Sequence, residues 1–436
     1  MKSLLKIFCL VFFATSAMAQ DNVYPGAPQK ETIALINGTI HVGNGQVIEN
    51  GMVVFEKGKI VSVGSKGTTP AGAKVIDVAG KHVYPGLILS SSNLGLAEVP
   101  SVRATLDESE FGEYNTNVRS IVAYNTDSRV INTLRNNGIL LASITPGGGI
   151  ISGSSTVVQL DAWHWEDAAV AMDNGMHFRM PNLLIRRGGR GGFGMFGAAA
   201  SNVDPVQAGL NRIEDVKSFF KEAKAYLTEV KPAQTNPSFE ATRKLFNKEQ
   251  KFYIHCNVVK EMLIAVEFAK EFGFDVVIVG GSDSYLIADI LKENNISVIL
   301  NDMHSLPTMA DDDVAQPYKT PGILQKAGVL FSINDTHTNS RYRNLAFNAG
   351  TAAAYGLTKE QALSAVTLNA AKILGVDKIT GSLEAGKDAN IVVSEGDILD
   401  MRSNLILHAF IQGRTVNLDD KAKQLADRYK YKYNIK

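Results

Sequence analysis

The sequence predicts a mixed α/β protein, in which β-rich segments at the two ends flank a middle part of alternating strands and helices. Short strand patterns separated by hairpin turns run through residues 32–83, and a similar pattern returns at 389–417. Between them, β-rich and helical runs alternate at a nearly constant interval, which is typical of parallel βα units. The middle part is therefore either a doubly wound sheet or a closed barrel, and the two ends could complete one sandwich.

The length and composition are those of a globular protein. The 436 residues are 45% hydrophobic and 20% charged, which excludes wholesale disorder, collagen and a membrane bundle. The 44 Lys and Arg residues balance the 44 Asp and Glu residues, so no global charge points to nucleic acid or to an anionic membrane. We expect one large domain of roughly 250 residues with a satellite, and neither nucleic acid nor a membrane as partner.

The first 19 residues have the pattern of a Sec-type signal peptide. A basic start precedes residues 7–14, which are apolar but too short to span a bilayer, and Ala17-Met18-Ala19 supplies a small-x-small cleavage pattern. We expect cleavage after Ala19 and a periplasmic or secreted protein. Only Cys256 then remains, which cannot form an internal disulfide and is expected to lie buried in a strand.

The β-rich end segments are punctuated by turn signals. The N-terminal strands are expected at 33–36, 39–42, 52–55, 60–63 and 74–78, and the C-terminal ones at 389–393, 407–411 and 415–417. The predicted hairpin turns are Asn37-Gly38, Asn44-Gly45, Asn50-Gly51 and the turn around Gly58.

In the middle part, strands are expected at 252–256, 275–279, 297–300 and 329–333. Apolar residues with helical spacing predict helices over Val259–Phe272 and 285–293. Thr358 and Gln361 form a capping-box pattern at the start of another helix, and a last short helix is bracketed by Asn369 and Gly375.

A glycine-arginine segment, residues 186–194, interrupts this alternation. It superficially resembles an RNA-binding repeat, but a single copy in a neutral chain favours a loop over a barrel mouth.

Two runs resemble motifs of the amidohydrolase superfamily, especially its imidazolonepropionase-like members. Residues 84–95 begin with Tyr84-Pro85-Gly86, and residues 381–390 read G-S-L-E-A-G-K-D-A-N. The family has P-G-x-I-D-x-H-x-H in the first run and G-S-L-E-x-G-K-x-A-D in the second. Residues 130–149 and 358–375 look like further family regions, so that the resemblance covers about 32–418.

The resemblance implies a (β/α)8 TIM barrel over residues 84–375. It implies that this barrel is inserted in a composite β-sandwich formed by 32–83 and 380–418, with 419–436 as a C-terminal tail. A divalent metal such as zinc, bound by histidines at the barrel mouth, is the cofactor that the resemblance implies.

The chain departs from the family at the metal-binding positions. The two histidines of the first run are replaced by Ser91 and Asn93, and its aspartate by Leu89. The family's sixth-strand ligand corresponds to Gly280, which has no side chain to offer. Hydroxyl and carboxamide groups are poor zinc donors, so the first strand is expected to have lost its metal clamp.

Two family positions keep their residue type. His255 corresponds to the fifth-strand histidine ligand, although a buried histidine with one backbone partner is an equally simple interpretation. Asp335 corresponds to the eighth-strand aspartate, which the family uses as metal ligand and general base, and the alternative is an aspartate that caps local amides. His255 and Asp335 are therefore the predicted catalytic residues.

Two more histidines follow predicted strands. Because strand ends converge at a barrel mouth, His255, His304, Asp335 and His337 could form a rebuilt mononuclear site, since three protein ligands and a water suffice for zinc. The alternative is that they are unrelated surface or capping residues, so that one zinc or none is bound. The other histidines are expected to be structural: His41, His82, His164, His177 and His408.

Two functions follow from these observations. One is an exported hydrolase that cleaves the C–N bond of an amide or cyclic amide with a reduced or rebuilt metal site. The other is a metal-free, non-catalytic homologue that binds a small molecule or pairs with an intact amidohydrolase. The family resemblance implies a homo-oligomer or such a pairing. A phosphate-directed alternative rests only on Pro146-Gly147-Gly148-Gly149 and is weak.

Overall fold

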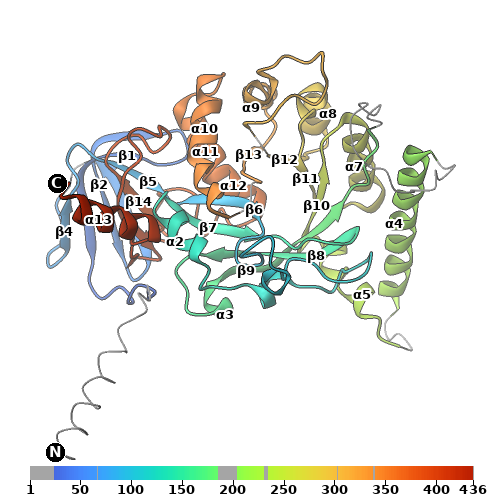
Figure 1. Ribbon diagram of the computed structural model, residues 1–436, viewed down its shortest axis with the longest axis horizontal. Coiled ribbons are helices and arrows are strands. Elements are labelled where there is room, and N and C mark those ends of the chain that lie inside the picture. Colours follow the sequence, from blue (N-terminus) through green and yellow to red (C-terminus); the bar gives the residue numbers. More distant parts are fainter. Residues whose placement is uncertain are drawn as a thin grey trace, which may run out of the picture.

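The computed structural model describes residues 24–65, 67–184, 204–229, 234–301, 303–336 and 339–435. The expected leader and the glycine-arginine segment lie outside the described residues. Two sheets of eight strands each organise the described part (Figure 1). Within the same residues, no helix has the length and apolar character needed to cross a membrane.

The first sheet joins the two ends of the chain, as expected for the composite β-module. Its strands are β1 (Ile33–His41), β2 (Val47–Glu56), β3 (Lys59–Ser65), β4 (Lys74–Asp77), β5 (His82–Pro85), β14 (Ile391–Ser394), β15 (Ile406–Ile411) and β16 (Arg414–Thr415). They are ordered β16-β15-β14-β5-β1-β2-β3, with β4 paired to β1. The antiparallel pair of β5 and β14 connects the N-terminal and C-terminal parts.

Two of the predicted hairpin turns in this sheet are wrong. Asn37 and Asn50 lie inside the continuous strands β1 and β2, with φ of 64° and 49°. The β1–β2 register shifts around Gly38, so this Asn-Gly pair makes a bulge instead of a chain reversal. The reversal between β2 and β3 occurs at Lys57-Gly58, where both residues have positive φ, as a two-residue hairpin requires.

The second sheet is the predicted barrel. Its strands are β6 (Leu87–Ser92), β7 (Ile139–Ile144), β8 (Ile151–Gln159), β9 (Ala169–Arg179), β10 (Lys251–Cys256), β11 (Val276–Gly280), β12 (Ser297–Leu300) and β13 (Phe331–Ile333). They are paired in chain order, and a 3.1 Å hydrogen bond from Ser90 Oγ to Ser332 Oγ links the first strand to the last. Cys256 is buried on β10, as expected.

The barrel differs from a regular (β/α)8 barrel at β8, which runs antiparallel to both β7 and β9. All other neighbouring strands of this sheet are parallel. The β7–β8 connection covers only residues 145–150, which is too short for the crossover that a parallel pair needs.

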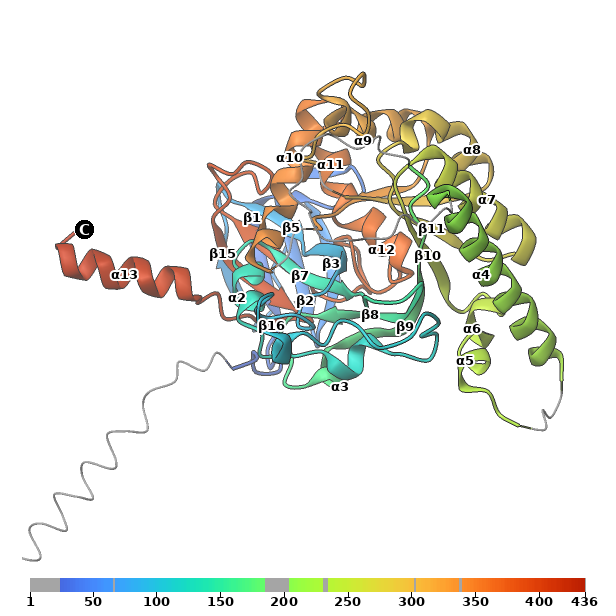
Figure 2. The same ribbon diagram turned by 45° about the vertical axis from the view of Figure 1, so that its right-hand side comes forward.

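Helices cover the outside of the barrel (Figure 1). The α-helices of the described residues are α2 (Arg129–Arg135), α3 (Trp165–Ala168), α4 (Pro205–Thr228), α5 (Pro237–Glu240), α6 (Arg243–Phe246), α7 (Val259–Phe272), α8 (Ala288–Glu293), α9 (Gln316–Ala327), α10 (Leu345–Ala354), α11 (Lys359–Ala365), α12 (Leu368–Leu374) and α13 (Lys421–Tyr433), of which α13 lies away from the barrel (Figure 2). The α7 helix has the predicted bounds, and the predicted capping box of Thr358 and Gln361 is present at α11.

An aromatic cluster packs the β9–β10 wall against these helices. The ring of Phe252 lies 5.3 Å from that of Phe220 on α4 and 5.8 Å from that of Phe268 on α7, and Phe178 lies 5.4 Å from Phe268. Because residues alternate between the two faces of a strand, Phe178 and Phe252 turn their neighbours His177 and Tyr253 toward the inside of the barrel.

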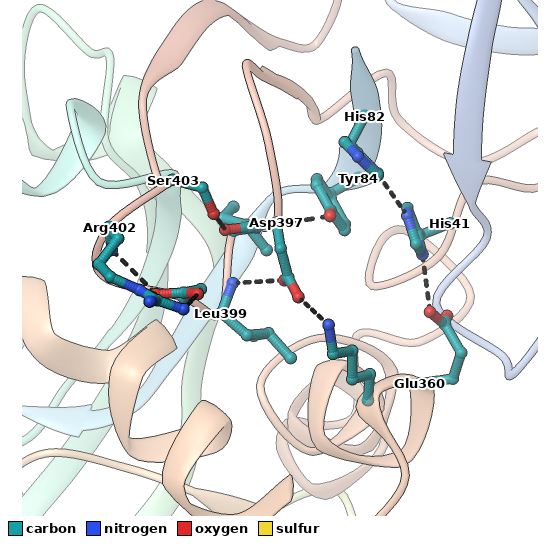
Figure 3. A network of polar contacts seen from close by, with 11 residues as sticks. His41, His82, Tyr84, Glu360, Asp397, Leu399, Arg402 and Ser403 are labelled. Carbon is teal, nitrogen blue, oxygen red and sulfur yellow. Dashed lines mark hydrogen bonds and ion pairs between the residues drawn. The ribbon is translucent and has the colours of Figure 1, made fainter. Parts of the chain in front are cut away.

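A polar network joins the first sheet to helix α11 (Figure 3). His41 Nδ1 lies 2.7 Å from Glu360 Oε1, and His41 Nε2 lies 3.0 Å from His82 Nδ1. The ring of Tyr84 stacks on His41 at 4.4 Å between centroids. His41 and His82 therefore have the structural role that the sequence predicts.

The expected C-terminal tail contains the helix α13. Figure 2 shows it projecting away from the rest of the molecule, and none of its residues is buried. Its first turn is held by Lys423, whose Nζ donates to Asn136 Oδ1 at 2.6 Å.

Candidate functional site

The site begins on the wall formed by β9 and β10. His177 is paired with Tyr253, and Arg179 with His255, across the parallel ladder. These four side chains share the inner face of the barrel, opposite the aromatic cluster. Arg179 and His255 stand at or next to the carboxyl ends of their strands, which in this fold class is where sites are built.

His177 and His255 bind each other. His177 Nδ1 lies 2.9 Å from His255 Nε2, and His177 Nε2 is buried without a hydrogen-bond partner among the described residues. A buried N–H without a partner is costlier than a bare nitrogen acceptor. We therefore assign the donated proton to His177 Nδ1, which leaves His255 with a proton on Nδ1.

Both rings are held neutral. Burial, together with the smaller effect of the nearby Arg179 guanidinium, lowers the pKa of His255 to about 3. Burial also lowers the pKa of His177 well below its usual value, with smaller contributions from His255 and Arg179. The pair can accept and donate hydrogen bonds at neutral pH, but it carries no charge.

Arg179 brings the positive charge of this wall. Its Nε donates to Ser152 Oγ at 3.1 Å, and its Nη2 donates to the carbonyl oxygen of Pro146, also at 3.1 Å. Burial lowers the pKa of Arg179, and the negative charge of Glu108 partly offsets this effect.

Asp335 lies two residues beyond the end of β13 and is 2% exposed. Its Oδ2 accepts a hydrogen bond from Asn348 Nδ2 of α10 at 3.2 Å. The preceding residue, Asn334, bridges to β6, because its Nδ2 donates to the carbonyl oxygen of Ser91 at 2.9 Å and its Oδ1 accepts from the amide of Ser91 at 3.2 Å. The ends of the first and last barrel strands are thus fixed together beside Asp335.

The two positions that replace the family's paired histidines have separate partners. Ser91 Oγ lies 3.2 Å from Thr145 Oγ1. Asn93 Nδ2 donates to Glu108 Oε2 at 2.6 Å, and Asn93 Oδ1 accepts from the Tyr342 hydroxyl at 2.6 Å. Burial raises the pKa of Tyr342, and the charges of Asp335 and Glu108 raise it too, so Tyr342 stays protonated and donates.

The other residues that the sequence predicts for the site are Gly280, His304 and His337. Gly280 ends β11 with φ of 110°, and a Cβ there would lie 2.5 Å from Asn257 Oδ1, so this backbone leaves no room for a ligating side chain. His304 Nε2 lies 3.2 Å from Thr351 Oγ1 of α10, and its ring faces Tyr318 of α9. His337 lies outside the described residues.

The donor set does not fit the metal centre that the fold family implies. No three described His, Cys, Asp or Glu side chains are grouped so that they could hold a metal ion. His255 directs Nε2 to His177, and its other nitrogen carries the proton in the tautomer assigned above. The adjacent Arg179 guanidinium would also repel a cation. No chemical step is therefore derived through a metal.

The sequence interpretation missed several residues of this site. His177 was expected to be only structural, but it lies on the inner face of β9 as the partner of His255. Arg179, Glu108 and Tyr342 were not singled out. His177 and Arg179 are two residues apart at the end of an apolar strand, a spacing that could have placed both on one face. Glu108 and Tyr342 come from segments without a motif.

Comparison with known proteins agrees with this architecture. Residues 261–418, from α7 to just beyond β16, match the model of the amidohydrolase family. A search of curated proteins found no match.

Solved structures share the fold over almost their whole length. An amidohydrolase from Thermotoga maritima MSB8 is 24% identical, with a TM-score of 0.75 over 88% of this chain and 99% of that one. A putative prolidase from Bifidobacterium longum is 18% identical (TM-score 0.54; 92% and 100% covered), and a zinc-bound adenosine deaminase from Xanthomonas campestris is 14% identical (TM-score 0.51; 94% and 99% covered). The family model thus matches the C-terminal part of the chain, and the solved structures share its fold.

Proposed function

We propose that this protein hydrolyses the C–N bond of a small amide or cyclic amide at the mouth of its barrel, and that it does so without the family's binuclear metal centre. The observation that carries the proposal is the position of Asp335, a buried carboxylate two residues beyond β13. We propose that this carboxylate activates the attacking water. The match of residues 261–418 to the amidohydrolase family model supports the reaction class. The unsuitable donor set supports the independence from metal.

The described residues supply the groups for such a reaction. Asp335 accepts the proton of the water whose oxygen forms the new bond to the carbonyl carbon. The C–N bond then breaks, and the leaving nitrogen takes up a proton. His255 presents a neutral N–H donor on the wall where negative charge on the carbonyl oxygen could be stabilised, and Arg179 places a fixed cation next to it.

We further propose that Ser91, Asn93 and Gly280 stand at former metal-ligand positions of an imidazolonepropionase-like ancestor. Their present contacts support this interpretation, because Ser91 and Asn93 form hydrogen bonds to protein groups and Gly280 leaves no space for a side chain. The leader-like N-terminus suggests that the reaction takes place outside the cytoplasm.

The test is a screen of N-acyl amino acids, primary amides and cyclic amides with the purified mature chain. Asp335→Asn should lower kcat by about 10²- to 10⁴-fold, the range expected for loss of a general base. Asp400→Asn, at an exposed surface ion pair, is the matched control and should leave kcat unchanged. Turnover that survives Asp335→Asn would contradict the proposal.

A second candidate function is a metal-free, non-catalytic homologue that binds a small molecule or pairs with an intact amidohydrolase. The mutual hydrogen bond of His177 and His255 favours it, because the two groups closest to the family's ligand chemistry are occupied with each other. This candidate predicts ligand binding without turnover for every compound of the screen.

A further inference from the structure

Arg179 is a fixed cation with spare hydrogen-bonding capacity. Its two hydrogen bonds, to Ser152 and Pro146, go to uncharged oxygens and use two of the five N–H groups of the guanidinium. Within the part of the chain that the structure describes, Arg179 forms no ion pair. The remaining N–H groups are therefore available to a ligand.

Arg135, a buried arginine on helix α2, shows the alternative in which the charge is paired within the protein. Arg135 is 4% exposed, and its Nη1 lies 2.7 Å from the carboxylate of Asp161, which is 1% exposed. For Arg179 the nearest candidate is Glu108, but Glu108 Oε2 accepts a hydrogen bond from Asn93 instead. A partly buried charge without a counter-ion is unfavourable, and such groups are retained where a ligand pairs with them.

The surroundings of Arg179 favour an anion of small size. Its neighbours His177 and His255 are neutral, so they add no second positive charge that would recruit a polyanion. A planar guanidinium anchored on one edge presents its other edge to a carboxylate in a bidentate arrangement. Ser152 and Pro146 fix its orientation from β8 and the loop before it.

We infer that Arg179 binds a carboxylate on the small molecule that enters the barrel mouth, so that the ligand is an amide bearing a free carboxylate, such as an N-acyl amino acid. The inference rests on the proposed function for the identity of the amide, and on Arg179 alone for the charge. Arg179 is then a specificity residue of this site.

Equilibrium binding tests the inference with matched pairs that differ only in charge. The probes are N-acetyl derivatives of glycine, leucine, phenylalanine and proline, each as the free acid and as the primary amide. Binding is measured by calorimetry to the full mature chain in an Asp335→Asn background, so that no probe is consumed. The acid should bind about 10- to 100-fold more tightly than its amide, as expected for a charge-assisted hydrogen-bond pair.

Variants of Arg179 and Glu108 test which residue causes the preference for the acids. Arg179→Gln should bring the acid-to-amide ratio close to one, and Arg179→Lys, which keeps the charge but loses the planar fork, should give an intermediate ratio even if the Gln variant does not fold. Glu108→Gln should tighten binding of the acids and leave the amides unchanged. If Arg179 served only to balance Glu108, this variant would instead lower the melting temperature without changing the ratio.

The outcomes separate this inference from the proposed function. A ratio near one in the parent protein, a ratio that persists in Arg179→Gln, or no binding by any acid would overturn the inference. Hydrolysis of uncharged amides that depends on Asp335 would then still support the proposed function. If the acids bind much more tightly than the amides but no probe is hydrolysed, the inference is supported and the proposed hydrolase function is contradicted.

Discussion

The Nδ1 atom of His177 lies 2.9 Å from the Nε2 atom of His255, so the two imidazoles of the barrel wall are hydrogen-bonded to each other. This contact spans two neighbouring strands and is enclosed by Arg179 above it and by Tyr253, whose ring stacks on His177 at 4.9 Å, below it. The contact explains the poor fit to a metal, and burial keeps both rings uncharged.

Metal removal should leave the protein unchanged. We expect metal analysis of the purified chain to find far less than one zinc per molecule, and dialysis against EDTA to alter neither kcat nor Tm. Zinc added in excess should give no Tm increase, whereas a specific site at 100 times its Kd would stabilise the fold by about 2.7 kcal/mol. One zinc per chain that is lost in His255→Ala would show that the donor set has been misjudged.

Stability should decline as the pH falls from about 6.5 to about 3. The pKa of His255 is lowered from 6.5 to about 3 in the folded state. Between these two pH values, His255 is therefore protonated in the unfolded chain and neutral in the folded one. Each such histidine costs about 1.4 kcal/mol of unfolding free energy per pH unit.

Urea denaturation at pH 7, 6, 5 and 4 measures this dependence. His82, His177 and His408 also have pKa values lowered by burial and contribute in the same direction, so the informative quantity is the difference between the parent and His255→Asn. The variant should show the shallower slope. Equal slopes would mean that His255 is accessible to protons in the folded state.

The buried ion pair of Arg135 and Asp161 should be costly to break on one side only. Nη1 of Arg135 donates to Asp161 Oδ1 at 2.7 Å, and Gly26 donates its amide proton to the other oxygen at 2.8 Å. Arg135→Met should lower the unfolding free energy by about 3–5 kcal/mol, because an unpaired carboxylate stays buried.

Adding Asp161→Leu should recover part of this loss in the double variant, measured in the same urea titration. Arg402→Met, which breaks the exposed pair with Asp400, is the control and should cost less than about 1 kcal/mol. A single-variant loss as small as that of the control would indicate that water reaches Asp161.

Expression with the native N-terminus in a bacterium with a Sec system should yield a mature chain that begins at Gln20. N-terminal sequencing of the periplasmic fraction measures this directly. Substituting Ala19 by a bulky residue, Ala19→Phe, should leave the precursor uncleaved, because the small-residue pattern before the cut is lost. An intact Met1 in the purified protein would exclude the predicted leader.

The sequence was most informative where local chemistry decides the structure. Helix α7 and the capping box at Thr358 follow from apolar periodicity and side-chain caps, and both were predicted at the observed residues. Asn37-Gly38 misled because the same left-handed preference serves a turn or a bulge, and only pairing with a neighbouring strand decides between them. The reversed direction of β8 likewise depends on a short connection whose partners lie elsewhere.

The site was harder to predict because its contacts are non-local. The sequence singled out His255 and Asp335, but the partners that give His255 its properties, His177 and Arg179, are set by the β9–β10 register. The Glu108–Asn93–Tyr342 chain joins three segments that no motif connects.

The pairing of β5 with β14 also means that the first sheet cannot be completed until late in synthesis. The first five strands are synthesised early, yet their sheet keeps an open edge at β5 until residue 391 has been made. An unpaired strand edge attracts other chains. Until β14 has been synthesised, that edge is therefore exposed to pairing with other chains, and a chaperone that covers β5 would protect the nascent chain from aggregation.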